Sequence, residues 1–286
     1  MKKTKTWVIK VKDYIAGIDR KWLITWGLIW VSFVSLDFFF QFLRGEIFIG
    51  VTALKYTGVV LCFIYARKKF AEDYLLQIAL LFTMLADTIL MLDSVSEVGV
   101  LVFCMAQYFH IARFAGTGPL FFLGWNVLIV IFLFLGQSSN IPDMYILASI
   151  YFISLLCNII LTGRWWRRSK QGIVAAPVSE EGVTSTNTEN QTGKRHFIRN
   201  IQKRYLNLPP ESREREIVAS TCAFIGFILF LCCDLNVMCS YFSVTGVLSS
   251  SLTRYFNFFA WVFYYPSQVL ISNSSIIFSK SKRRKS

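Results

Sequence analysis

The sequence is poor in histidine: only His110 and His196 occur among its 286 residues. A histidine-rich metal site is therefore excluded, and a serine–histidine pair in the apolar part of the chain would have to use His110 alone. The Gly-x-Ser-x-Gly, His-Glu-x-x-His and glycine-rich phosphate-binding motifs are missing too. We expect no metal and no cofactor.

The cysteine pattern of a disulfide framework or a zinc site is also absent. The seven cysteines are odd in number, and nearly all of them lie inside apolar blocks instead of in spaced pairs. We therefore expect them to act as small, buried hydrophobic side chains.

Long polar stretches are scarce, because 55% of the residues are hydrophobic and the mean hydropathy is +0.50. The apolar residues fall in blocks of about 17–24, and a block of about 18 or more with few charges is typical of a membrane span. No small-residue cleavage site follows the first block, so we interpret it as a span and not as a signal peptide. The sequence predicts an all-α, polytopic transmembrane helix bundle with about eight spans. The expected spans are residues 22–42, 50–66, 74–92, 98–115, 119–135, 144–162, 217–240 and 256–277.

The basic residues, which give a net charge of +13, lie between alternate spans and at the two ends of the chain. With both termini in the cytoplasm, 27 of the 30 lysines and arginines fall on the cytoplasmic side, and only Arg44, Lys55 and Arg254 do not. The positive-inside rule favours this orientation. No nucleic-acid-binding motif accompanies the charge, so we expect the lipid bilayer as a partner and no nucleic acid. The basic ends and the lack of a targeting signal indicate a bacterial-type plasma membrane, and the oligomeric state is left open.

One polar segment interrupts the apolar blocks after the sixth span. It is rich in Ser, Thr, Glu and Asn and cannot bury a core, so we expect disorder there, with basic flanks on anionic lipid. The expected organisation is a basic cytoplasmic segment at 1–21, transmembrane helices 1–6 at 22–163, a basic, disordered cytoplasmic loop at 164–216, transmembrane helices 7–8 at 217–277 and a basic tail at 278–286.

Four ionisable residues lie within the expected spans: Asp37, Asp87, His110 and Asp234. Such residues are costly in a membrane and usually face the interior of a bundle. Each aspartate lies five or six residues before the outer end of its span, so the three carboxylates are expected at nearly one level, about 8–9 Å below the outer boundary. Carboxylates that share a dry site take up protons at different pH values, so one can act as an acid while the other acts as a base.

A purely structural interpretation of these residues stays open. Each aspartate can be satisfied separately, by a backbone carbonyl or by a hydroxyl such as that of Thr83 or Thr88. His110 lies near the basic end of its span, which favours an interfacial position over catalysis. Mid-span Gln107 and Gln268 can serve as interhelical hydrogen-bonding groups or as part of a polar site.

Three segments with intramembrane polar residues resemble the YhhN family of membrane proteins, which includes animal lysoplasmalogenases. Residues 80–92 (LLFTMLADTILML) resemble the family segment LLFSxxGDxxLM, and residues 226–237 (GFILFLCCDLNV) resemble GALLFxxSDxxLA. Residues 264–271 (YYPSQVLI) are similar to YYxAQxLI, and Lys55 is similar to the lysine before the second helix. The order of the segments and the eight-helix plan agree with the family.

The chain departs from the family pattern in its fourth span, which identifies it as a divergent member. The family carries AHxxYI there, whereas residues 106–111 read AQYFHI, so Gln107 takes the place of the histidine and His110 that of an aromatic residue. The polar segment before the seventh span is an insertion.

The resemblance implies hydrolysis of the vinyl-ether bond of lysoplasmalogens, with a lysophospholipid-type substrate. Asp87 and Asp234 are then the catalytic acid and base, with neither role assigned to one residue. The supporting polar side chains are expected to be those of Gln107, His110, Tyr265, Gln268 and Asp37. Lys55 and Arg254, on the outer side, are candidates for binding the head-group phosphate, although both also suit the flank of a helix.

Two other classes of function agree with the same residues. In a proton-coupled transporter of small molecules the aspartates would relay protons, and repeats with broken helices near the midplane would be expected. In a non-catalytic accessory protein of the membrane, substitution of either aspartate would alter stability alone.

Overall fold

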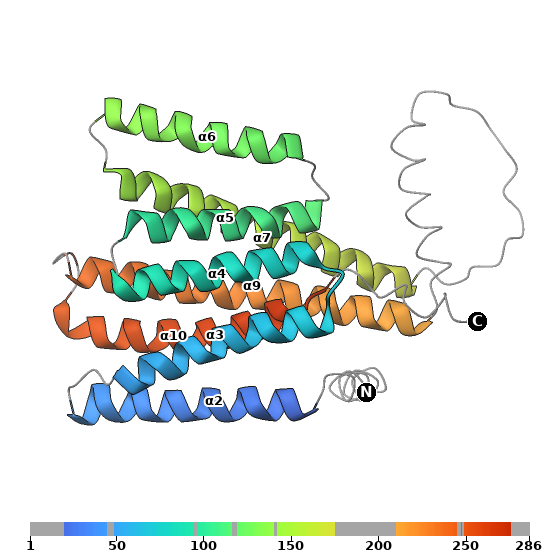
Figure 1. Ribbon diagram of the computed structural model, residues 1–286, viewed down its shortest axis with the longest axis horizontal. Helices are drawn as coiled ribbons and strands as arrows, with labels where there is room; N and C mark the ends of the chain where they lie inside the picture. The colour runs from blue at the N-terminus through green and yellow to red at the C-terminus, as the bar shows by residue number, and fades with distance from the viewer. Residues whose placement is uncertain are drawn as a thin grey trace, which may run out of the picture.

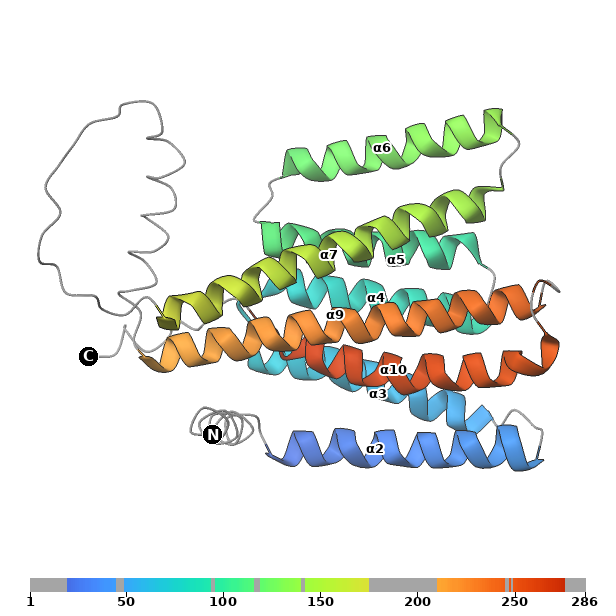
Figure 2. The same cartoon turned by 180° about the vertical axis from the view of Figure 1, so that it is seen from behind.

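The computed structural model describes residues 20–44, 49–93, 96–115, 119–139, 142–174, 210–244, 247 and 249–275. These residues form helices and short connections, and no strand occurs among them, which confirms the all-α bundle. Figures 1 and 2 show the helices lying side by side with their axes nearly parallel. The helices are α2 (Arg20–Phe38), continued by a π-helical segment η1 (Phe39–Arg44), α3 (Ile49–Lys69), α4 (Tyr74–Leu92), α5 (Glu97–Ala115), α6 (Pro119–Ser138), α7 (Asp143–Val174), α9 (Pro210–Val244), the 3-10 turn η2 (Ser250–Leu252) and α10 (Thr253–Ser272).

Each of the eight expected spans corresponds to one helix. Five of the described helices (α2 with η1, α4, α5, α7 and α9) are long and apolar enough to cross a membrane, and α3, α6 and α10 pack beside them. The main differences lie at the ends. α10 ends at Ser272 rather than at 277, because residues 272–275 (SNSS) bind other helices instead of continuing the turn. Expected residues 276–277, the expected disorder of the polar segment and the terminal segments 1–19 and 278–286 lie outside the described residues.

Six helices form a closed ring, in which each contacts the next in the order α3, α4, α5, α7, α9, α10 and back to α3. α2 packs on the outside against α3 and α10, and α6 packs on the outside against α7. Side chains on the inner faces of the ring therefore meet partners from helices that are distant in the sequence.

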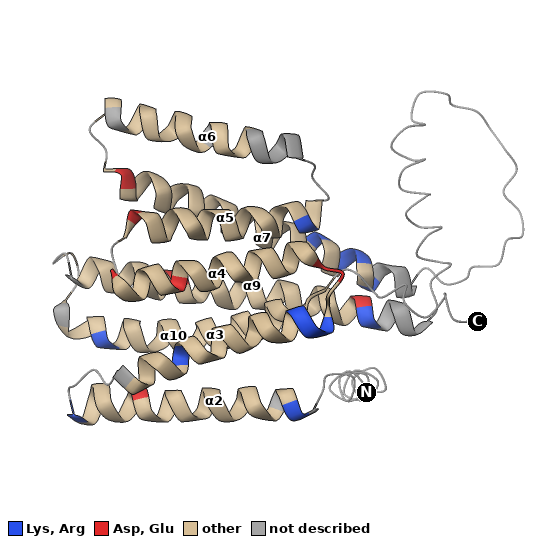
Figure 3. Ribbon diagram, viewed as in Figure 1, with Lys and Arg blue, Asp and Glu red and all other residues tan. Residues whose placement is uncertain are grey.

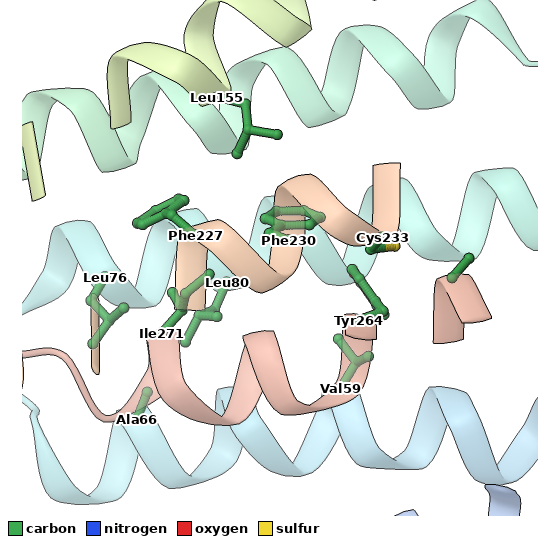
Figure 4. Packing of buried hydrophobic residues seen from close by; sticks show 11 residues of the cluster. Val59, Ala66, Leu76, Leu80, Leu155, Phe227, Phe230, Cys233, Tyr264 and Ile271 are labelled. Atoms are coloured by element: carbon green, nitrogen blue, oxygen red, sulfur yellow. The ribbon is translucent and has the colours of Figure 1, made fainter. Parts of the chain in front are cut away.

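The interior of the ring is filled mainly by apolar side chains, which Figure 4 shows from close by. Leu80 of α4, Leu155 of α7, Phe227 of α9 and Ile271 of α10 meet there, and all four are almost fully buried. Gly226 of α9 lets α10 approach closely, because a Cβ at that position would lie 2.9 Å from the side chain of Ile271. The polar residues described below are thus set in apolar surroundings.

The two ends of the bundle differ in charge. α7 has 32 residues and α9 has 35, or about 48 and 52 Å, whereas a hydrocarbon core is about 30 Å thick. Both helices project past their neighbours at one end, where lysines and arginines gather (Figure 3). We call this the basic end, and the opposite end the far end. α7 continues through 164–174 and α9 begins at Pro210, so both helices reach into the region expected as a loop.

Candidate functional site

Asp87 lies on the inner face of α4 and accepts a hydrogen bond from a tyrosine of α10. The Tyr264 hydroxyl donates to Asp87 Oδ2 over 2.5 Å, and Asp87 is 8% exposed. Tyr264 in turn packs against Phe230 of α9, with 5.5 Å between the ring centroids. The carboxylate is thereby held across the ring by a residue that is 177 positions away in the sequence.

Asp234 of α9 also accepts a hydrogen bond from a tyrosine, in this case one of α7. The Tyr151 hydroxyl of α7 donates to Asp234 Oδ2 over 2.6 Å. Asp87 and Asp234 lie close enough to interact electrostatically, and both also interact with the Cys233 thiol. The two aspartates thus lie within electrostatic range of each other, and their role as an acid–base pair stays a prediction. We call Asp87, Asp234 and their two tyrosines the carboxylate level.

Neither carboxylate has a cationic partner among the described residues. Each is oriented by a neutral hydroxyl donor, so its charge is not cancelled by a lysine or an arginine. Two carboxyl groups held at fixed positions in apolar surroundings can divide the roles of proton donor and proton acceptor between them.

Asp37 does not join the other two aspartates. It lies between α2 and α3, where Asp37 Oδ2 accepts a hydrogen bond from Lys55 Nζ over 2.7 Å and Oδ1 accepts one from Gln41 over 2.6 Å. Both charged side chains of this ion pair are about 7% exposed. Lys55, expected as a phosphate ligand, thus already has a buried counter-ion.

The Lys55–Asp37 pair is nevertheless connected to the carboxylate level through one aromatic ring. Lys55 Nζ lies 5.1 Å from the centroid of the Trp261 ring, within the range of a cation–π interaction. The Trp261 ring meets the Tyr264 ring edge to face, with centroids 5.2 Å apart and an interplanar angle of 88°. The ion pair therefore supports the ring that positions Tyr264.

A second polar layer lies one helical turn nearer the basic end. Asn158 of α7 donates from Nδ2 to Gln107 Oε1 over 2.8 Å and to the backbone carbonyl of Gln107 over 3.1 Å. Gln268 of α10 follows Tyr264 by four residues, which places it on the same helix face. All three amides are almost fully buried. We call Gln107, Asn158 and Gln268 the amide level.

His110 and Tyr265 are both buried in the bundle, each in aromatic surroundings. His110 is 2% exposed, and its ring packs edge to face on Phe227 of α9, with centroids 5.1 Å apart. Tyr265 faces away from the carboxylates: it packs against Phe33 of α2 and closely against Gly58 of α3. Adjacent residues on a helix point about 100° apart, so Tyr264 reaches Asp87 and Tyr265 does not.

Arg113, near the end of α5, forms a buried ion pair that closes the basic end of the ring. Its Nε donates to Asp73 Oδ2 over 3.2 Å, and its two other nitrogens donate to the side chain and the carbonyl of Ser274. Asp73 also caps α4 by accepting from the backbone N–H of Leu76, and Ser275 donates to it over 2.9 Å. The end of α10 is thereby tied to α4 and α5.

Three members of the polar interior were not among the expected site residues: Tyr151, Tyr264 and Asn158. Asn158 could have been identified from the sequence, because it is a polar amide inside an expected span, as Gln107 is. Tyr264 lies in the family-like segment 264–271, but the sequence does not show which of its two tyrosines faces Asp87, and Tyr151 lies in none of the quoted segments. Arg254 lies exposed at the start of α10, and no group of three potential metal ligands occurs in the described part of the chain.

The comparison with known families supports the motif-based resemblance. The model of the YhhN family matches residues 50–179, which include α3 to α7 and Asp87 but neither α9 nor α10. Neither a curated protein nor a solved structure matches the chain. Over residues 50–179, somewhat less than half of its length, this helical membrane protein is therefore similar to the YhhN family.

Proposed function

We propose that this protein is a membrane-embedded lipid hydrolase that cleaves the vinyl-ether bond of lysoplasmalogen-type lysolipids. The observation that carries the proposal is the carboxylate level: Asp87 and Asp234 interact inside the ring, each oriented by a tyrosine and neither ion-paired among the described residues. The resemblance of the segments around both aspartates to the YhhN family points to the same chemistry.

The reaction requires one acid and one base. One carboxyl transfers its proton to the carbon of the double bond that is farther from the ether oxygen, which leaves an oxocarbenium ion. The other carboxylate takes a proton from water as the water oxygen bonds to the carbon next to the ether oxygen. The resulting hemiacetal breaks its bond to the glycerol oxygen, which regains a proton. The products are an aldehyde and a glycerophospho compound, and water is the only co-reactant.

The surroundings of the site suit a lipid substrate. The helices that carry the two aspartates, α4 and α9, are both apolar enough to cross a membrane, which suits a substrate that is itself a lipid. Arg254, exposed at the start of α10 and at the far end, is our candidate for the head-group phosphate. Lys55 is less suited to that role because Asp37 already neutralises it.

The transport alternative has no comparable support. It calls for helices that are broken near the midplane. α4, α7 and α9 are continuous over their described lengths, and α10 is helical on both sides of Pro266.

The test is aldehyde release from a 1-alkenyl lysolipid by the detergent-purified protein, with 1-alkyl and 1-acyl lysolipids alongside. We expect release from the 1-alkenyl lipid by the wild type and a loss of about 10²–10⁴-fold in Asp87→Asn and in Asp234→Asn. Glu97→Gln, which removes an exposed carboxylate at the far end, is the matched control and is expected to keep full activity. Size-exclusion profiles establish that each variant is folded. No release from any of the three lipids would refute the proposal.

A further inference from the structure

The Gln107–Asn158 pair leaves hydrogen-bonding groups unused in the interior of the ring. Both residues are 0% exposed, yet Gln107 Nε2 and Asn158 Oδ1 have no hydrogen-bond partner among the described residues. A buried polar group without a partner destabilises the folded protein, and such groups in native proteins usually bind water or a ligand.

This surplus does not depend on how the two amides are oriented. Rotating both amide groups by 180° keeps a hydrogen bond between them, but it again leaves one NH₂ group and one carbonyl oxygen over. The observed orientation is the better one, because Asn158 Nδ2 also donates to the backbone carbonyl of Gln107. One donor and one acceptor from different helices therefore stay available.

A third helix supplies another donor to the same layer. Gln268 of α10 is 1% exposed, and its Nε2 likewise has no partner within the described residues. It lies between Tyr264 and Ile271 on one face of α10, and both of these point into the interior of the ring. The available groups of the amide level are thus two NH₂ donors and one carbonyl acceptor, all uncharged.

The amide level is close to the carboxylate level. On the inner face of α5, Phe103 packs against Tyr151, which binds Asp234, and Gln107 follows Phe103 by one turn. α4 and α5 are antiparallel neighbours, with Asp87 five residues before the end of α4 and Gln107 ten residues after the start of α5. The two side chains are therefore offset by about 7–8 Å along the bundle.

We propose that the amide level binds the free hydroxyl of the substrate glycerol and thereby selects lysolipids over lipids that lack this hydroxyl. The inference rests on the proposed function, because it concerns the substrate of the same site. A hydroxyl both donates and accepts, which matches the uncharged donors and acceptor present, whereas a charged group would be buried without a counter-ion.

The length of the substrate agrees with this spacing. The hydroxyl oxygen is five bonds from the carbon that receives the proton. With a hydrogen bond of about 3 Å at the hydroxyl, that distance is sufficient to bridge the offset between the two levels. A site that hydrogen-bonds a substrate hydroxyl discriminates strongly against the analogue without it, since its own polar groups are then left unpaired.

The experiment measures binding and does not depend on turnover. Affinities of the detergent-purified protein are measured by calorimetry for a 1-alkyl lysolipid, which contains no vinyl ether, and for its 2-deoxy analogue, which lacks the oxygen and adds no bulk. We expect the wild type to bind the hydroxyl form at least about tenfold more tightly. The preference should fall to near unity in Asn158→Leu and in Gln107→Met.

Asn236→Leu is the matched control, because the Asn236 amide bonds within its own helix, to the carbonyl of Cys232, and the preference should persist there. Equal affinity of the wild type for both lipids would show that the amides hold a structural water only and would overturn the inference. The wild-type comparison needs no variant, so it decides the matter even where a substitution prevents folding. A protein that prefers the hydroxyl form but releases no aldehyde from alkenyl lipids refutes the proposed function alone.

Discussion

Four aspartates of the described helices and their caps fall into two pairs with opposite environments. Asp37 and Asp73 are each bound to a buried cation, Lys55 and Arg113 respectively, and lie at the periphery or at the basic end of the ring. Asp87 and Asp234 lie inside the ring and accept a hydrogen bond from a tyrosine instead. Aspartate therefore forms a structural ion pair at two of these positions and has a neutral hydrogen-bond donor as its partner at the other two.

The difference explains why aspartates at similar positions along their helices need not have similar roles. A buried ion pair whose partners are both present is electrically neutral and serves to fix helices relative to one another. A carboxylate bound by a neutral hydroxyl keeps the ability to gain or lose a proton without breaking a link between helices. The ion-paired aspartates should therefore matter chiefly for stability and the tyrosine-bound aspartates chiefly for activity.

The strongest test of this contrast is Arg113→Met. It leaves Asp73 buried without its cation and removes the contacts with Ser274, so we expect the free energy of unfolding to fall by about 3–5 kcal/mol. Thermal unfolding in detergent measures the loss. Arg167→Met, an exposed position on α7, should stay within about 0.5 kcal/mol of the wild type.

Lys55→Met should lower the free energy of unfolding somewhat less, by about 3 kcal/mol, because fewer hydrogen bonds are lost with the lysine. The double variant Asp37→Asn/Lys55→Met should regain part of this loss, since no unpaired charge stays buried. A double variant as unstable as Lys55→Met alone would show that the ion pair is not what Lys55 contributes.

Tyr264→Phe removes the hydrogen bond to Asp87 and keeps the ring that packs on Trp261. The hydrogen bond contributes about 0.5–1.5 kcal/mol with a neutral Asp87 carboxyl and about 1.5–3 kcal/mol with a charged one. We therefore expect the free energy of unfolding to fall by about 0.5–3 kcal/mol, together with reduced aldehyde release. Tyr255→Phe, at an exposed position of α10, should change neither quantity.

The smallest effect on stability is expected for Asp87→Asn. The Asn oxygen can still accept a hydrogen bond from Tyr264. The free energy of unfolding should therefore change by less than about 1 kcal/mol, while the activity is lost. A loss of stability as large as that of Lys55→Met would erase the distinction between the two kinds of aspartate. Calorimetric unfolding of both variants under one set of conditions makes the comparison direct.

Much of the fold could be predicted from hydropathy alone. The span expected at 74–92 coincides with α4, and the others agree with helices within a few residues, except where α7, α9 and α10 differ at their basic ends. Hydropathy locates the apolar part of a helix and contains no information on polar continuation, which is why α7 continues beyond residue 162 undetected. The orientation of the bundle in its membrane stays a prediction.

The site could be predicted only in part. Intramembrane aspartates are conspicuous in a sequence, so Asp87 and Asp234 can be singled out as candidates from the sequence alone. Depth along a helix says nothing about the direction in which a side chain points, and for that reason Asp37 was grouped with them although it faces Lys55. Tyr264 and Tyr265 are neighbours in the sequence, and only the rotation of α10 decides which of them meets Asp87.

The projecting parts of α7 and α9 are joined side by side beyond the ring. Trp165 donates to Glu216 over 3.0 Å, Ser169 and Ser220 share a hydrogen bond of 2.7 Å, and the Trp166 ring stacks on Phe224. The two helices are therefore held together by direct contacts between them, in addition to the chain that links Val174 to Pro210. A polypeptide cut between Val174 and Pro210 should assemble from its two fragments when they are co-expressed, because these contacts hold α7 against α9 without the link.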